Sequence, residues 1–209
     1  MMRLGWLGCC AAALLGAQES EPSLAAIRDA ALRRVIAAEV VAAEERGTPS
    51  APLIEKALEG QLKGANAARI GEAVHALALR LAAARDHLRP VLELDEVKVG
   101  ADALSAGLGP ADLKKLRAAW PNRSVAMPLG VVTELVTRGV TPPRATKMVL
   151  DLMKRGATVS HLASLGSEVQ RDVSTGRAPD AALDLRVRGI MSLLTPGATA
   201  VLAPRGGKP

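Results

Sequence analysis

The amino-acid sequence predicts an all-α protein in which an N-terminal hairpin of long helices is followed by an array of short helical hairpins. Apolar residues recur at helical spacings of three and four in the first half, and glycine and proline separate short apolar segments in the second. The 209 residues include no Phe, no Tyr and only two Trp. The apolar content is therefore mainly alanine, leucine and valine, of which alanine and leucine favour helices. Such a core needs many thin elements in close contact, packed as a bundle or as an irregular solenoid.

Residues 1–17 have the features of a signal peptide. Arg3 provides a positive start, and residues 4–16 form an uncharged, mostly apolar run that is too short to span a bilayer. We expect cleavage after Ala17, so that the exported chain begins at Gln18. An uncleaved N-terminal anchor is the alternative.

Both cysteines of the chain, Cys9 and Cys10, lie in this leader. Lipidation of a cysteine is a further alternative, but Trp6 stands where a lipoprotein signal prefers leucine. Because both cysteines leave with the leader, the exported chain is expected to form no disulfide and no thiolate metal site. Trp6 leaves with the leader as well, so Trp120 is the only aromatic residue expected in the mature protein.

The first helix is expected from Pro22 to the stop signal at residues 47–50. One apolar stripe runs along this helix, and three further residues widen the stripe. The stripe consists of Leu24, Ile27, Ala31, Val35, Ala38 and Ala42, and the widening residues are Leu32, Ile36 and Val40. A second helix is expected over residues 52–63, with Gly64 as its C-cap. Its expected buried residues are Leu53, Ala57, Leu58 and Leu62.

The segment after Asn66 carries the clearest helical pattern, because its apolar residues follow one narrow face. These residues are Ile70, Val74, Leu77, Leu81, Ala84 and Leu88. The helix is expected to stop before Pro90. Within residues 91–99, residues 91–95 alternate weakly, as a strand would, but no convincing second strand is available to pair with them. We therefore expect a linker followed by a helix there.

Short helices are expected over residues 100–194, because glycine just past one helix and proline just inside the next recur there. The copies of this punctuation are Gly107–Pro110, Gly139–Pro142 and Gly176–Pro179. Residues 18–194 are thus expected to form a single helical domain, with 90–99 as an alternative internal boundary. The Gly- and Pro-rich residues 195–209 are expected to be a flexible tail.

A block of short motifs starts at Leu53. It consists of Leu53-Ile-Glu-Lys-Ala-Leu-Glu-Gly60, Lys63-Gly64-Ala65, Arg69-Ile70, Ala73-Val74, Leu77 and Arg80-Leu81. The block resembles one that recurs in uncharacterised exported bacterial all-helical proteins, and the turn from Arg138 to Pro142 is similar to segments that follow it there. The resemblance covers most of the mature chain. It implies an exported all-helical protein, and it carries no known activity and no catalytic residues.

Charge is distributed unevenly along the chain. Residues 18–98 contain 11 basic and 13 acidic side chains, whereas residues 99–209 contain 15 basic and 8 acidic ones. A basic half of this kind attracts anionic polymers or membrane surfaces. The candidate anion-contacting residues are Lys114, Lys115, Arg117, Arg144, Lys147, Lys154 and Arg155. The alternative is that these residues belong to solvated helix faces.

Trp120 is a candidate contact surface. A lone tryptophan before Pro121 either offers a platform to a partner or fixes a helix–loop contact. Base stacking needs several aromatic side chains, so sequence-specific nucleic-acid binding is not expected.

No catalytic, cofactor or metal site is expected. His75 and His87 share one predicted helix, where they are separated by about 18 Å along the helix axis and about 120° around it. The two side chains therefore cannot bind one metal ion together. His161 stands alone. Carboxylates cluster in two places, at Glu44 and Glu45 and at Glu93, Asp95 and Glu96. Adjacent carboxylates in a linker are usually solvated charges. The sequence contains neither the nucleophile-elbow motif of hydrolases nor a glycine-rich phosphate loop.

These observations favour an exported, periplasmic or secreted, non-enzymatic interaction or scaffold protein with an unknown protein partner. One alternative is an envelope protein whose basic C-terminal half docks on an anionic polymer or a membrane surface. Another alternative is an enzyme that uses a helical cleft. Repeated helical hairpins can present an extended binding surface, which is why the scaffold is the leading hypothesis.

Overall fold

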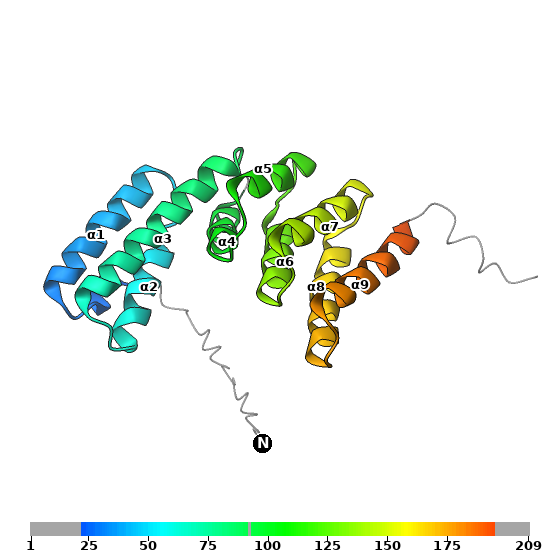
Figure 1. Ribbon diagram of the computed structural model, residues 1–209. Helices are drawn as coiled ribbons and strands as arrows, with labels where there is room; N and C mark the ends of the chain where they lie inside the picture. Colours follow the sequence, from blue (N-terminus) through cyan, green and yellow to red (C-terminus); the bar gives the residue numbers. More distant parts are fainter. Residues whose placement is uncertain (1–21, 92, 195–209) are drawn as a thin grey trace, which may run out of the picture.

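A computed structural model describes residues 22–91 and 93–194 of the chain (Figure 1). Within these residues the protein has nine α-helices, one short 3₁₀ helix and no strand. The predicted all-α fold class is therefore confirmed. The expected signal peptide at 1–17 and the expected tail at 195–209 lie outside the described residues.

The helices follow one another with short connections. The 3₁₀ helix is η1 (Leu24–Ala26), and the α-helices are α1 (Ala30–Glu45), α2 (Ala51–Leu62), α3 (Ala67–His87), α4 (Leu94–Ser105), α5 (Pro110–Ala119), α6 (Ala126–Thr137), α7 (Pro142–Lys154), α8 (Val159–Ser174) and α9 (Pro179–Leu194).

The helices form two rows. The odd-numbered helices make an outer row in which α1 contacts α3, α3 contacts α5, α5 contacts α7 and α7 contacts α9. The even-numbered helices make an inner row, in which α6 contacts both α4 and α8. Figure 1 shows α2, α4, α6 and α8 lying below the outer row. Because each helix packs mainly on its near neighbours in the two rows, the arrangement is that of a solenoid.

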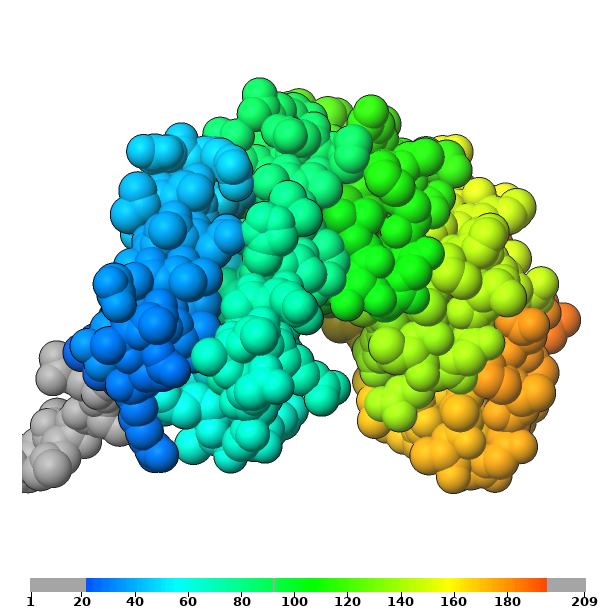
Figure 2. Space-filling model, turned by 60° about the vertical axis from the view of Figure 1, so that its left-hand side comes forward, coloured from blue at the N-terminus to red at the C-terminus, as the bar shows by residue number. Residues whose placement is uncertain are grey.

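The two rows curve around a hollow. Figure 2 shows this hollow between the end of α2 with the start of α3, in cyan, and the C-terminal helices, in yellow to orange. The green middle of the chain covers it from above. The inner row therefore faces a concave side of the molecule.

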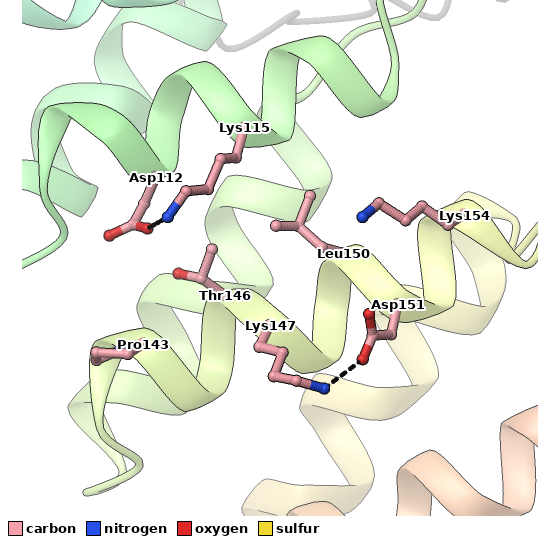
Figure 3. A pocket seen from close by; sticks show the side chains of 8 residues that line it. All are labelled: Asp112, Lys115, Pro143, Thr146, Lys147, Leu150, Asp151 and Lys154. Carbon is pink, nitrogen blue, oxygen red and sulfur yellow. Dashed lines mark hydrogen bonds and ion pairs between the residues drawn. The ribbon is translucent and has the colours of Figure 1, made fainter.

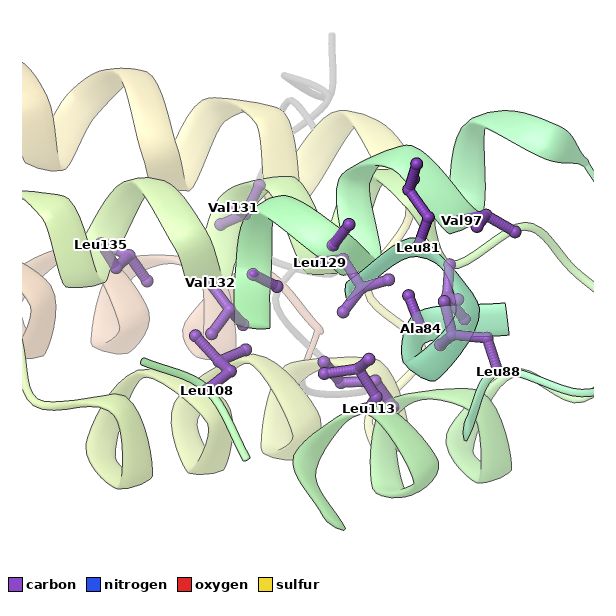
Figure 4. Packing of buried hydrophobic residues seen from close by; sticks show 14 of the residues in the cluster. Leu81, Ala84, Leu88, Val97, Leu108, Leu113, Leu129, Val131, Val132 and Leu135 are labelled. Atoms are coloured by element: carbon purple, nitrogen blue, oxygen red, sulfur yellow. The ribbon is translucent and has the colours of Figure 1, made fainter. Parts of the chain in front are cut away.

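One hydrophobic core runs through the array from Ile27 to Ile190. Figure 4 shows the part where α3, α4, α5 and α6 meet, with Leu81, Leu113 and Leu129 among its residues. α4 packs tightly against α3 at Gly100, where an added Cβ would lie 3.0 Å from Ala84 Cβ and 2.8 Å from Cδ1 of Leu88, the residue that follows α3. A side chain at that position would separate the two helices.

The predicted glycine and proline punctuation is present. Gly107, Gly139 and Gly176 have φ values of +101°, +98° and +95°, a conformation that only glycine adopts freely. The next amide after each glycine donates to a carbonyl five residues earlier, which closes a Schellman turn. Pro110, Pro142 and Pro179 then open α5, α7 and α9. One helix thus ends and the next begins at each of these three boundaries.

The first helix differs from the sequence prediction. It begins at Ala30 instead of residue 22, because Asp29 caps it by accepting hydrogen bonds from the Ala31 and Leu32 amides at 2.7 and 2.9 Å. Its buried face consists of Leu32, Ile36, Val40 and Ala43. Val35, which the sequence placed on the main stripe, is 52% exposed. The predicted main stripe was wrong within α1 because it extended the helical spacing across the break at residues 27–29, whereas the residues expected to widen it, Leu32, Ile36 and Val40, are buried.

The next helices follow the sequence more closely. Leu53 and Ala57 of α2 are buried, but Leu62 is 81% exposed because it is the last residue of that helix. The predicted face of α3 is confirmed, with Ala78 more deeply buried than Leu77. The expected linker and helix after Pro90 are also present. The C-terminal array begins at Leu94, somewhat before residue 100, and not all of its helices are short, because α8 and α9 have 16 residues each, as α1 does.

Candidate functional site

The structure separates the seven predicted anion-contacting residues into distinct environments. Lys115, Lys147 and Lys154 border one groove between α5 and α7. Lys114 and Arg155 are exposed and do not line that groove. The remaining two residues, Arg144 and Arg117, are engaged with other parts of the chain and are described below.

We call the depression between α5 and α7 the lysine groove, and its volume is about 350 Å³ (Figure 3). The Lys115 ammonium contacts Asp112 of the same helix at 3.2 Å, and the Lys147 ammonium contacts Asp151 at 2.8 Å. The Lys154 side chain reaches toward the groove beside Leu150 and forms no ion pair with any described residue. The groove thus carries three lysines against two aspartates, on neighbouring helices of the outer row.

Thr146 also lines the lysine groove. It is only 2% exposed, and its Oγ1 has no hydrogen-bond partner within the described part of the chain. A threonine in a helix commonly donates to the carbonyl four residues earlier. Thr133 of α6 does so, with its Oγ1 2.8 Å from the Leu129 carbonyl oxygen. Thr146 therefore retains an unused buried hydroxyl at the groove.

Arg117 is not available to an external anion, which corrects the sequence prediction. The residue is 5% exposed, and its guanidinium donates to the carbonyl oxygens of Leu88, Trp120 and Arg123 at 3.0, 3.3 and 2.9 Å. It also pairs at 2.5 Å with Glu96, which is fully buried. This arginine holds α5 against the end of α3 and the start of α4.

Glu96 was expected among solvated linker carboxylates, and that expectation was wrong. Besides pairing with Arg117, its Oε1 accepts a hydrogen bond from the Val125 amide at 2.8 Å. Val125 immediately precedes α6, so the carboxylate ties α4 to the start of α6. Its neighbours Glu93 and Asp95 are exposed, as the sequence analysis supposed.

Trp120 is buried, with 6% of its surface exposed, so it offers no platform to a partner. It ends α5, and the guanidinium of Arg123 lies 4.0 Å from the centre of its ring. The indole therefore stabilises the loop between α5 and α6 through packing and a cation–π contact.

Arg144 and Arg186 join neighbouring helices at the C-terminal end. Arg144 of α7 donates to both carboxylate oxygens of Asp184 in α9 at 2.7 Å. Arg186 of α9 makes a two-point contact with Asp172 of α8, and it holds the pKa of that carboxyl below the ordinary value of 3.8. The sequence shows Arg186 only as one of the basic residues of the C-terminal half, because its partner Asp172 becomes a neighbour only when α8 and α9 pack together.

A second groove lies between the inner helices α2 and α4, with a volume of about 290 Å³. Leu77 and Leu81 of α3 form its apolar floor. Its walls carry Glu55, Lys56 and Glu59 from α2 and Lys98 and Asp102 from α4. We call it the inner groove.

The carboxylate of Glu59 lies at the α2 wall of the inner groove, where Lys56 contacts it at 2.8 Å and Lys63 contacts it as well. Hydrogen bonds from these two ammonium groups lower the pKa of Glu59 to about 2. The carboxylate is thus charged at neutral pH, and the inner groove combines an apolar floor with charged walls of both signs.

The histidines lie apart. His75 Nδ1 is 2.7 Å from a carboxylate oxygen of Glu39 across α1 and α3, and His161 contacts Thr158 at the start of α8. Over the described ranges, no group of three or more His, Cys, Asp and Glu residues is placed to hold a metal ion. No helix in the part that the structure describes has the length and apolarity to cross a membrane.

Comparison of the chain with protein-family models, with curated proteins and with solved structures gives no match in any of the three.

Proposed function

We propose that this chain is an exported, non-enzymatic interaction protein that binds an extended segment of a partner protein on its concave side. The observation that carries the proposal is the hollow below the inner row of helices (Figure 2), together with the inner groove that opens between α2 and α4. Curved helical arrays commonly bind partners along such a surface.

The inner groove has the composition that recognition of a polypeptide requires. Its floor of Leu77 and Leu81 can take an apolar side chain, and burial of that side chain would supply affinity. The charged side chains on both walls can select the partner by charge and fix its register. Because both signs are present, the partner segment should itself contain acidic and basic residues.

The binding hypothesis is tested by capturing envelope proteins with the chain of residues 18–209 at low and high salt. The informative variant carries Glu55→Lys and Asp102→Lys, which reverse two exposed charges on opposite walls of the inner groove. The matched control carries Glu45→Lys and Glu72→Lys, which make the same change in net charge at exposed positions outside that groove.

Support requires one defined protein that is retained at high salt by the wild type and by the control, and that is lost with the groove variant. Retention by the groove variant would contradict binding at this site. Capture of an anionic polymer or of membrane at low salt only would instead support the alternative of electrostatic docking through the basic half.

Export is a separate part of the proposal and rests on the expected signal peptide. Intact-mass analysis of the protein recovered from the periplasm or the medium should give a chain that starts at Gln18. A recovered chain that retains Met1 would contradict cleavage at that position.

A further inference from the structure

We propose that the lysine groove binds a phosphate monoester group. The groove lies between α5 and α7 in the outer row, whereas the proposed partner surface lies at the inner groove between α2 and α4. The two proposals are therefore independent, and each can fail without the other.

The cationic side of the site comes from two helices. Lys115 projects from α5 and Lys154 from α7 toward the space between these two helices, whereas Lys147 of α7 turns away from α5 toward Asp151 (Figure 3). Lys154 forms no ion pair with a described residue and could contact a ligand without releasing another group. The other two lysines can reorient about their flexible stems, because they are 60% and 68% exposed.

The acidic residues of the groove leave its net charge positive. Asp112 is occupied by Lys115 and by the Gly109 amide, which donates to its second oxygen at 3.3 Å. Asp151 is occupied by Lys147. With three lysines against two aspartates, an anion is favoured over a cation, and a ligand must compete with Asp151 for Lys147.

Thr146 supplies the second, independent observation. Its hydroxyl is almost fully buried at the groove and has no partner in the described chain, whereas buried polar groups are nearly always hydrogen-bonded. An anionic oxygen in the groove would give this hydroxyl the acceptor that the protein does not provide. Leu150, beside it, offers an apolar surface to the organic part of the same ligand.

The donors match a phosphate better than a carboxylate. A phosphate monoester presents three terminal oxygens and a charge approaching −2 at neutral pH, so it can accept from several ammonium groups and from the hydroxyl at once. A volume of about 350 Å³ is sufficient for a small organic phosphate. The phosphate could belong to a soluble metabolite or to the headgroup of a lipid.

The test uses the chain of residues 18–209 at low ionic strength. Calorimetric titrations measure binding of inorganic phosphate and glycerol 3-phosphate, and flotation measures binding to vesicles that contain phosphatidic acid or, for comparison, phosphatidylglycerol. Phosphatidic acid carries a phosphate monoester, whereas phosphatidylglycerol is an anionic diester. The comparison therefore separates recognition of the group from general attraction to negative charge.

We expect Lys154→Gln to weaken binding of the phosphate monoester about tenfold, because it removes one charge-assisted hydrogen bond. Thr146→Val should weaken binding without lowering the thermal stability, because the hydroxyl makes no internal bond that the variant would lose. Asp151→Asn should strengthen binding, since it releases Lys147. Lys114→Gln is the matched control, because Lys114 is an exposed lysine of α5 outside the groove.

Saturable binding of glycerol 3-phosphate with this order of affinities would support the site and identify a soluble ligand. The same order of affinities seen only with phosphatidic acid vesicles would support the site and place the phosphate on a lipid. Three results would overturn the proposal: no saturable binding to any probe, equal losses from Lys114→Gln and Lys154→Gln, or equal binding to the two kinds of vesicle.

Discussion

The buried pair of Arg117 and Glu96 joins the middle of the chain through polar contacts. The guanidinium donates to three backbone carbonyls, and the carboxylate accepts from the Val125 amide. Two charges removed from water are tolerated only where partners satisfy them in this way. The pair therefore specifies how α4, α5 and the start of α6 meet, in a region where apolar packing alone would permit small shifts.

Removal of Arg117 should be strongly destabilising, because Glu96 and three carbonyl oxygens would lose their buried partner. We expect Arg117→Ala to lower the free energy of unfolding by about 3–5 kcal/mol. Urea denaturation measures the change. The control Arg155→Ala, at an exposed position, should change stability by less than about 0.5 kcal/mol. Equal effects of the two substitutions would refute the role given to Arg117.

Stability should depend on acid pH through Asp172. Hydrogen bonds from Arg186 lower the pKa of this carboxyl from its ordinary value of 3.8 in the folded state. The stabilisation is therefore complete above about pH 4 and is lost as the pH falls through the depressed folded pKa. Asp172→Asn should be less stable than the wild type at pH 7, and the difference should shrink below pH 3. A difference that stays constant from pH 7 to pH 2 would contradict this assignment.

At the scale of the elements, the crossing of α3 and α4 depends on Gly100. An added Cβ would lie 2.8 Å from Leu88 Cδ1 and 3.0 Å from Ala84 Cβ. Gly100→Ala should therefore lower the free energy of unfolding by about 1–3 kcal/mol, even though alanine favours helices. Gly71→Ala, in open space on α3, should raise it by about 0.5–1 kcal/mol. Urea denaturation of the two variants gives the comparison, and effects of the same sign would contradict it.

The elements that the sequence predicted well are those in which local signals and packing agree. Gly107 and Pro110 mark a boundary between two helices because one residue needs a positive φ and the other fits the first turn. In α1 the two disagreed. Apolar spacing placed Val35 at the centre of the face and Ile36 at its edge, whereas the cap at Asp29 and contact with α2 and α3 put Ile36 at the centre and leave Val35 exposed.

The candidate site was predictable in part. The basic character of the C-terminal half identified Lys115, Lys147 and Lys154, which line the lysine groove. The same criterion also identified Arg117, which is buried in an ion pair with Glu96. The sequence could not distinguish these two environments. That distinction depends on which helices become neighbours. The sequence could not predict that the hydroxyl of Thr146 lacks a hydrogen-bond partner. Thr133 also lies within a helix, but its hydroxyl does donate to a backbone carbonyl, that of Leu129.

At the scale of the whole molecule, the two rows make stability depend on position. Helices α3 and α6 contact neighbours on both sides in the array, whereas α1 and α9 contact neighbours on one side only. In such arrays stability is close to a sum over neighbouring contacts, so the ends should open first.

Native-state amide hydrogen exchange measures this gradient. We expect slow exchange in α3, α4 and α6 and faster exchange in α1 and α9, because opening an end helix breaks contacts on one side only. Equal protection along all nine helices of the described region would mean that the array opens as one cooperative unit, and would contradict the expectation.

Trp120 also makes the molecule a reporter of its own centre. In the chain expected after cleavage, tryptophan fluorescence would come from this one indole, at the junction of α5 and α6. The emission would change when the middle of the array unfolds and would not change when only the end helices fray. Far-UV circular dichroism, in contrast, weights every helix by its length. The difference between the midpoints of the fluorescence and circular dichroism transitions would therefore measure how independently the ends of the array unfold.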